Sequence, residues 1–152
     1  MENNAQHTVE VLNDLVNINN DRITGYEHAT KEIGEGHEDL KQLFTRLIGE
    51  SHQNKLALGT EIQTFRKDIE DGTYNSGKLH RTWLDVKAFF TGHSERGVLE
   101  ECEFGEDAIK KVYRQAIEDE HLPAYIKDIL QEQEQKLLAA HDEVKALRDS
   151  AQ

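Results

Sequence analysis

Apolar residues recur every three or four positions along most of the chain, a spacing that places them on one face of an α-helix. Two glycines, Gly34 and Gly36, interrupt this pattern in the first half, and we expect one of them to adopt a left-handed cap conformation. The turn sequence EDGTYNSG and a turn ending at Pro123 divide the second half. The pattern therefore predicts four long helices, at residues 8–33, 38–69, 94–118 and 123–148.

A shorter amphipathic segment, LHRTWLDVKAFF, lies within residues 78–90 between the second and third long helices. It predicts a short extra helix that His80, Arg81 and Trp83 anchor to the rest. The first and second helices are joined tightly, as are the third and fourth, whereas the middle connection is long enough to travel the length of a bundle. We therefore predict an all-α, ferritin-like, up-down-down-up four-helix bundle with a short helix in its crossover, forming a single domain over residues 1–152.

The overall charge is acidic and changes which partners are expected. The sequence has eighteen Lys and Arg residues and thirty Asp and Glu residues, which gives a formal net charge of −12. Phosphate backbones and anionic lipid surfaces would be repelled, so we expect neither nucleic acid nor membrane as a partner. The chain shows no signal peptide pattern and one cysteine, Cys102, which the helical wheel places among buried apolar residues. We expect a cytoplasmic protein.

Several polar residues fall on the inward faces of the predicted helices. Three of them are amides, Asn19, Asn54 and Gln133, which lie at comparable depth along the bundle, with Tyr113 somewhat below them. The inward or edge positions also include acidic residues and one histidine: Glu27, Glu50, Glu61, Glu101, Glu106 and His141. The wheel turns Glu103 and Asp107 largely outward. These positions support two different interpretations.

The first interpretation is a carboxylate-bridged dinuclear metal site, because iron and other hard cations take several oxygen ligands and each helix of a bundle can supply one or two. In this hypothesis Glu106, Glu50 and Glu27 hold the metal and His141 completes the site. The usual Glu-x-x-His pattern is missing, since the matching positions read Glu50-x-x-Gln53 and Glu103-x-x-Glu106.

The second interpretation needs no metal. Asn19, Asn54, Gln133 and Tyr113 would form a hydrogen-bonded polar layer that fixes the register of the helices. The glutamates near the core edge would then pair with lysine or arginine, because a buried carboxylate is costly without a cation or hydrogen-bond donors. The sequence leaves both interpretations open.

Three motifs carry a family resemblance: Leu79-His80-Arg81-x-Trp83, Glu101-Cys102-Glu103-x-Gly105-Glu106-Asp107 with Tyr113, and the late pair His141-Asp142. Together they resemble a bacterial family of uncharacterised ferritin-like four-helix-bundle proteins, a domain of unknown function. The resemblance covers nearly the whole chain and implies the ferritin-like fold with a crossover helix, but no established activity. Relatives by fold use di-iron centres, and the resemblance carries their ligands over only as candidates: Glu27, Glu50, Glu103, Glu106 and His141.

Two functions follow as hypotheses. One is a metal-binding ferritin-like protein, with iron or manganese as the candidate metal, acting in a stress response or in iron handling. The other is a non-catalytic structural or interaction bundle with a metal-free polar core layer. The sequence leaves open whether the protein is an enzyme. We consider a second copy of the chain as a partner, in a homo-oligomer such as a dimer.

Overall fold

The structure is a computed structural model that describes residues 2–69 and 94–151. These residues form four long helices, α1 (Glu2–Ile33), α2 (Glu38–Ile69), α4 (Glu95–Ile117) and α5 (Ala124–Ser150). The predicted all-α four-helix bundle is confirmed, and the bounds of α2 are those that the pattern predicts. The expected short helix at residues 78–90, with His80, Arg81 and Trp83, lies outside the described residues.

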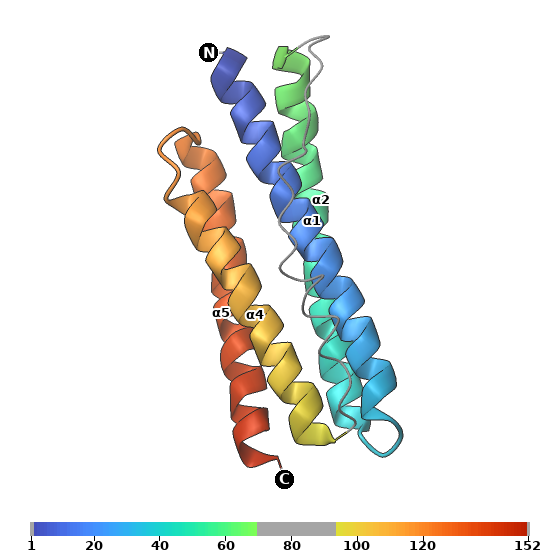
Figure 1. The fold of residues 1–152 in the computed structure, drawn as a ribbon. Helices are drawn as coiled ribbons and strands as arrows, with labels where there is room; N and C mark the ends of the chain where they lie inside the picture. The colour runs from blue at the N-terminus through green and yellow to red at the C-terminus, as the bar shows by residue number, and fades with distance from the viewer. Residues whose placement is uncertain (1, 70–93, 152) are drawn as a thin grey trace.

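The helices form two antiparallel pairs that lie side by side (Figure 1). Helix α1 packs against α2, α4 packs against α5, and α1 joins the pairs by packing against α4. Figure 1 shows α2 and α4 running in the same direction, so the end of α2 and the start of α4 lie at opposite ends of the bundle. The four helices thus run up, down, down and up.

Local sequence explains where the helices begin and end. Gly34 and Gly36 follow α1 with φ angles of 73° and 90°, a left-handed conformation that glycine adopts without steric cost. Both glycines therefore adopt the left-handed conformation that was expected of one. The side chain of Ser94 caps α4 by accepting a hydrogen bond from the Gly97 amide at 3.0 Å. Pro123 is the N-terminal cap residue of α5.

Helix α1 begins at Glu2, six residues before the predicted start at Thr8. The polar residues before Thr8 hide the helical pattern in the sequence, but Ala5 and Thr8 are both buried and continue the inward face by one further turn. The prediction was wrong here because it placed the helix start directly before the first strongly apolar residue, Val9.

The core runs the length of the bundle and is built mainly from leucine, isoleucine and aromatic side chains. Burying one such side chain contributes about 1.5–3 kcal/mol. Cys102 belongs to this core, with 1% of its surface exposed, as predicted. The apolar core is interrupted at mid-length by buried polar residues from all four helices, which are Asn19, Arg22, Ser51, Asn54, Glu106, Gln133 and Glu134. These residues form the centre of the candidate site.

Candidate functional site

A buried arginine, Arg22 on α1, lies at the centre of the bundle. Its Nε donates to Oε2 of Glu106 on α4 at 2.9 Å, and its Nη1 donates to Oε1 of Glu50 on α2 at 3.0 Å. Nη1 also donates to the Ser51 hydroxyl at 3.0 Å. The side chains of Arg22 and Glu106 are fully buried, whereas that of Glu50 is 15% exposed. One guanidinium therefore joins three helices through charge-assisted hydrogen bonds.

Tyr26, one turn further along α1, completes the surroundings of this ion pair. Its hydroxyl donates to the same Oε2 of Glu106. The guanidinium carbon of Arg22 lies 5.7 Å from the centre of the Tyr26 ring, within the range of a cation–π interaction. The Tyr26 ring in turn packs against Phe44, with ring centres 5.4 Å apart. The carboxylate of Glu106 thus receives a cation and a hydroxyl donor, both from α1.

Burial and charge set the protonation of this group. Burial alone lowers the pKa of Arg22, but the negative charges of Glu106 and Glu50 and the hydrogen bond to Glu106 more than offset it, so the pKa is raised and the guanidinium stays charged. Burial and the adjacent Glu106 charge raise the pKa of Tyr26 well above its ordinary value. Burial also raises the pKa of Glu50, because desolvation outweighs its attraction to Arg22.

A ring of neutral polar groups lies beside the ion pair. Asn19 donates to the Tyr113 hydroxyl at 3.0 Å, and that hydroxyl donates to Oε1 of Gln133 at 2.6 Å. Gln133 donates to the Asn54 carbonyl oxygen at 3.4 Å, and the Asn54 side chain donates to Oδ1 of Asn19 at 3.2 Å. The hydrogen-bonded layer predicted from these four residues is confirmed, and it ties all four helices together.

The core does not fit a dinuclear metal centre, which a ferritin-like relationship would imply. The guanidinium of Arg22 already lies against the carboxylates of Glu106 and Glu50, and a metal cation there would be repelled by it. Within residues 2–69 and 94–151, Oε1 of Glu106 is the one oxygen of these two carboxylates that has no hydrogen-bond partner and is fully buried. With Oε2 of Glu106 and Oε1 of Glu50 held by Arg22, the two carboxylates cannot supply the several ligands that iron or manganese takes.

A second cluster lies on the face shared by α4 and α5. His141 Nε2 lies 2.9 Å from Oδ1 of Asp107 and 3.6 Å from Oε2 of Glu103. On the other edge of the ring, Nδ1 lies 3.3 Å from Oδ1 of Asp142, and Arg148 pairs with Oε1 of Glu103. Glu103 and His141 are each only 12% exposed, whereas Asp107 is half exposed. We call Glu103, Asp107 and His141 the α4–α5 cluster.

The five candidate ligands are thus divided among three places. Glu50 and Glu106 meet at Arg22, Glu103 and His141 meet in the α4–α5 cluster, and Glu27 is exposed on α1. Glu27 is therefore the one candidate ligand that lies with neither group. Glu103 is also more buried than its outward wheel position suggested, because Arg148 and His141 of α5 cover it.

Arg22 is the central residue that sequence reasoning missed, because it is not among the polar residues expected on the inward helix faces. A signal was present, since the buried positions Leu12, Leu15, Asn19, Arg22 and Tyr26 follow one another at alternating spacings of three and four. An arginine at such a position is buried only when a carboxylate meets it. That partner, Glu106, lies 84 residues away in the sequence.

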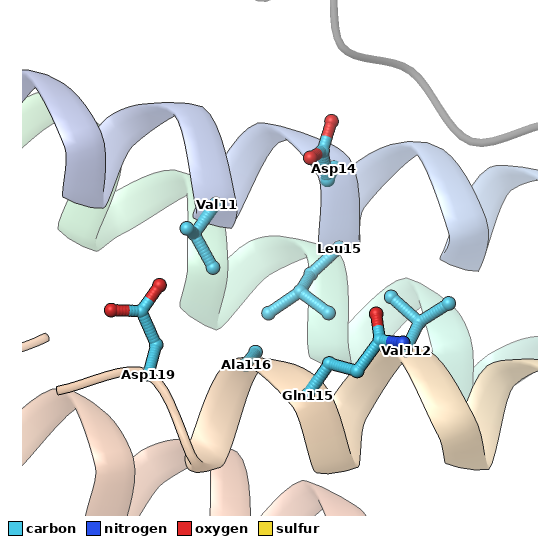
Figure 2. A pocket seen from close by; sticks show the side chains of 7 residues that line it. All are labelled: Val11, Asp14, Leu15, Val112, Gln115, Ala116 and Asp119. Carbon is cyan, nitrogen blue, oxygen red and sulfur yellow. The ribbon is translucent and has the colours of Figure 1, made fainter. Parts of the chain in front are cut away.

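The hollow between α1 and α4 shown in Figure 2 is lined by seven residues and has a volume of about 180 Å³. Val11 and Leu15 of α1 face Ala116 of α4 across it, and Asp119 lies at one end. The carboxylate of Asp14 points away from α4, so the two acidic groups do not converge. This hollow therefore gathers no set of ligand atoms.

The fold and its buried polar layer define a four-helix bundle with an ion-paired core. The chain belongs to the family described as Domain of unknown function (DUF2383), whose model matches residues 7–119. That match covers α1, α2 and α4, including Arg22, Glu50 and Glu106. No curated protein matches the chain. Among the described residues, no helix has an apolar stretch long enough to cross a membrane.

Proposed function

We propose that the protein is a non-catalytic structural or interaction bundle, in which Arg22 takes the position that a metal would take in a ferritin-like core. The observation that carries this proposal is the complete burial of Arg22 between the two core carboxylates that a metal would need. The alternative hypothesis, iron or manganese bound by core carboxylates, would require the guanidinium to leave. Moving the fully buried guanidinium away from both of its carboxylate partners would leave its own charge uncompensated, at a cost of several kcal/mol.

The polar layer is suited to fixing one arrangement of the helices. Apolar burial is non-directional, whereas the ring of Asn19, Tyr113, Gln133 and Asn54 satisfies its donors and acceptors in one register only. The ion pairs of Arg22 add the same constraint between α1, α2 and α4. A bundle held in this way presents fixed outer faces, which is what an interaction protein or a homodimer requires.

The remaining parts of the proposal rest on supporting observations. The up-down-down-up path supports a ferritin-like relationship (Figure 1). The net charge of −12 supports partners other than nucleic acid. The free thiol of Cys102, the one cysteine in the sequence, supports a role in the cytoplasm. We also propose that residues 1–152 form one domain, because α1 packs against both α2 and α4.

Metal content in matched variants tests the proposal. Wild type, Glu106→Gln and Glu50→Gln are purified from cultures supplemented with iron or manganese and analysed for metal per chain, with the exposed Glu118→Gln as control. We expect the same content in all four proteins, because metal bound elsewhere contributes equally to each. A metal that is present in wild type and in the control but lost in Glu106→Gln would overturn the proposal.

A further inference from the structure

The α4–α5 cluster places three ligand atoms of different side chains close together, away from the ion-paired core. Glu103 and Asp107 are four residues apart on α4, so they share one face of that helix, and His141 approaches them from α5. One imidazole nitrogen and one oxygen from each carboxylate lie within 4.8 Å of one another. In the residues that the structure describes, this is the single group of three or more such side chains with that geometry.

The orientation of the imidazole favours a cation between these atoms. Nδ1 lies 3.3 Å from Oδ1 of Asp142, so a hydrogen on Nδ1 has an acceptor there. Nε2 faces the carboxylates of Asp107 and Glu103. A positive charge between Nε2 and these carboxylates, either a proton on Nε2 or a metal ion in its place, attracts both carboxylates. A carboxylate on the outer nitrogen is also the arrangement that orients a metal-binding histidine.

The spacing of the ligand atoms is suitable for a small divalent ion. Bond lengths of about 2.0–2.2 Å put neighbouring ligand atoms about 2.8–3.1 Å apart in an octahedral site and about 3.3–3.6 Å apart in a tetrahedral site. The distances from Nε2 to the Asp107 and Glu103 oxygens are 2.9 and 3.6 Å, at the two ends of this combined range. Arg148 holds the other oxygen of Glu103, which leaves Oε2 for a single metal bond.

We propose that Glu103, Asp107 and His141 bind one divalent transition-metal ion, with Zn²⁺ as the representative ion. One nitrogen and two oxygen ligands suit Zn²⁺ and its neighbours better than Mg²⁺ or Ca²⁺, which take oxygen ligands alone. Three protein ligands leave at least one position for water. The site would link α4 to α5 and would be independent of the core that Arg22 closes.

Titration of the full-length protein with Zn²⁺, after dialysis against a chelator, tests this site. Isothermal titration calorimetry should give one Zn²⁺ per chain, and titration with Co²⁺ should give the visible absorption of a site with a nitrogen ligand. Asp107→Asn and His141→Gln should each weaken Zn²⁺ binding by more than about 100-fold. Asp142→Asn should weaken it by about 10-fold, as expected for an outer hydrogen-bond partner.

Two controls separate this site from general binding to an acidic protein with eight histidines. His52→Gln removes an exposed histidine on α2, and Glu118→Gln removes an exposed carboxylate at the end of α4. Both should bind Zn²⁺ as wild type does. The absence of saturable Zn²⁺ binding by wild type, or equal binding by wild type, Asp107→Asn and His141→Gln, would overturn the proposal.

A measurement on wild type alone decides the question if the variants fail to fold, which circular dichroism would reveal. Imidazole nitrogen NMR of the ¹⁵N-labelled protein follows both ring nitrogens of His141 as Zn²⁺ is added. Nε2 should shift on binding while Nδ1 keeps its hydrogen. An unchanged Nε2 signal at saturating Zn²⁺ would place the ion elsewhere and refute the site.

Discussion

Replacing Arg22 by methionine tests whether the guanidinium neutralises the core carboxylates. Methionine keeps a long flexible chain but removes the charge and the donors to Glu106, Glu50 and Ser51. Glu106, which is fully buried, would retain only the Tyr26 hydroxyl as a donor. Glu50 is 15% exposed and can be partly hydrated. Most of the cost should therefore come from Glu106.

Removing one partner of a buried ion pair costs about 3–5 kcal/mol, because the other charge is left without compensation. A domain of this size has a total stability of about 5–15 kcal/mol, so the loss would be a large part of it. With a shift of about 2–4 °C per kcal/mol, the melting temperature should fall by roughly 6–20 °C. Arg46→Met removes an arginine whose ion pair with Glu143 is exposed, and it should change the stability by less than about 1 kcal/mol.

Urea unfolding of wild type, Arg22→Met, Glu106→Gln and the double variant measures the coupling between the two residues. The double variant should be more stable than Arg22→Met alone, because glutamine removes the stranded charge and keeps nearly the same volume. The reasoning would be refuted if Arg22→Met cost no more than Arg46→Met, or if adding Glu106→Gln brought no recovery.

Four further outcomes follow from the buried groups. Tyr113→Phe removes the hydroxyl that links Asn19 to Gln133 and should lower the free energy of unfolding by about 1–3 kcal/mol in urea titrations; no change would contradict a role for the layer. The pKa of Glu50 is raised by burial, so its favourable contribution is present below its unfolded pKa of about 4.3 and is lost as pH rises through the folded value. Glu50→Gln should therefore gain stability relative to wild type between about pH 4 and 7, and a difference independent of pH would count against this. Burial and the charge of nearby carboxylates raise the pKa of the Cys102 thiol. Alkylation of this thiol at pH 8 should therefore be far slower in the native protein than in denaturant. Equal alkylation rates would contradict the burial of Cys102. Burial opposes ionisation of Asp119, but hydrogen bonds from the His121 amide and the His7 ring outweigh burial and lower the pKa of this carboxyl. Asp119→Asn should therefore cost stability above about pH 4, and the cost should shrink as the pH falls below that value. Melting temperatures of wild type and variant that differ equally at pH 3 and pH 7 would refute this.

The fold was largely predictable because it depends on local patterns. Apolar spacing located the four helices, and Gly34 and Gly36 marked the first turn because glycine alone reaches their φ angles without strain. The start of α1 was missed because polar side chains around Ala5 conceal its inward face. The direction of each helix followed from the lengths of the connections, because a short connection makes neighbouring helices antiparallel whatever their side chains are.

The polar layer was predictable for a similar reason. Asn19, Asn54, Gln133 and Tyr113 stand in the middle of apolar faces, and a buried amide or hydroxyl must find a partner at its own level. The position of Arg22 on the same face was equally visible, but an arginine is usually solvated, and its burial depends on Glu106 from a distant helix.

The α4–α5 cluster could not be predicted as a unit. An isolated wheel turns Asp107 and Glu103 largely outward from α4, and whether α5 covers them depends on how α5 is rotated against α4. That rotation brings His141 and Arg148 over the two carboxylates. It is set by packing along both helices, which no short motif encodes.

The most direct test of the central claim is a crystal structure of wild-type protein from cultures supplemented with iron and manganese, with anomalous scattering recorded at the absorption edge of each metal. We predict that the Arg22 guanidinium bridges Glu106 and Glu50 and that no anomalous peak lies within bonding distance of either carboxylate, whatever the α4–α5 cluster contains. An anomalous peak bound by Glu106 and Glu50, with Arg22 turned away, would contradict the account.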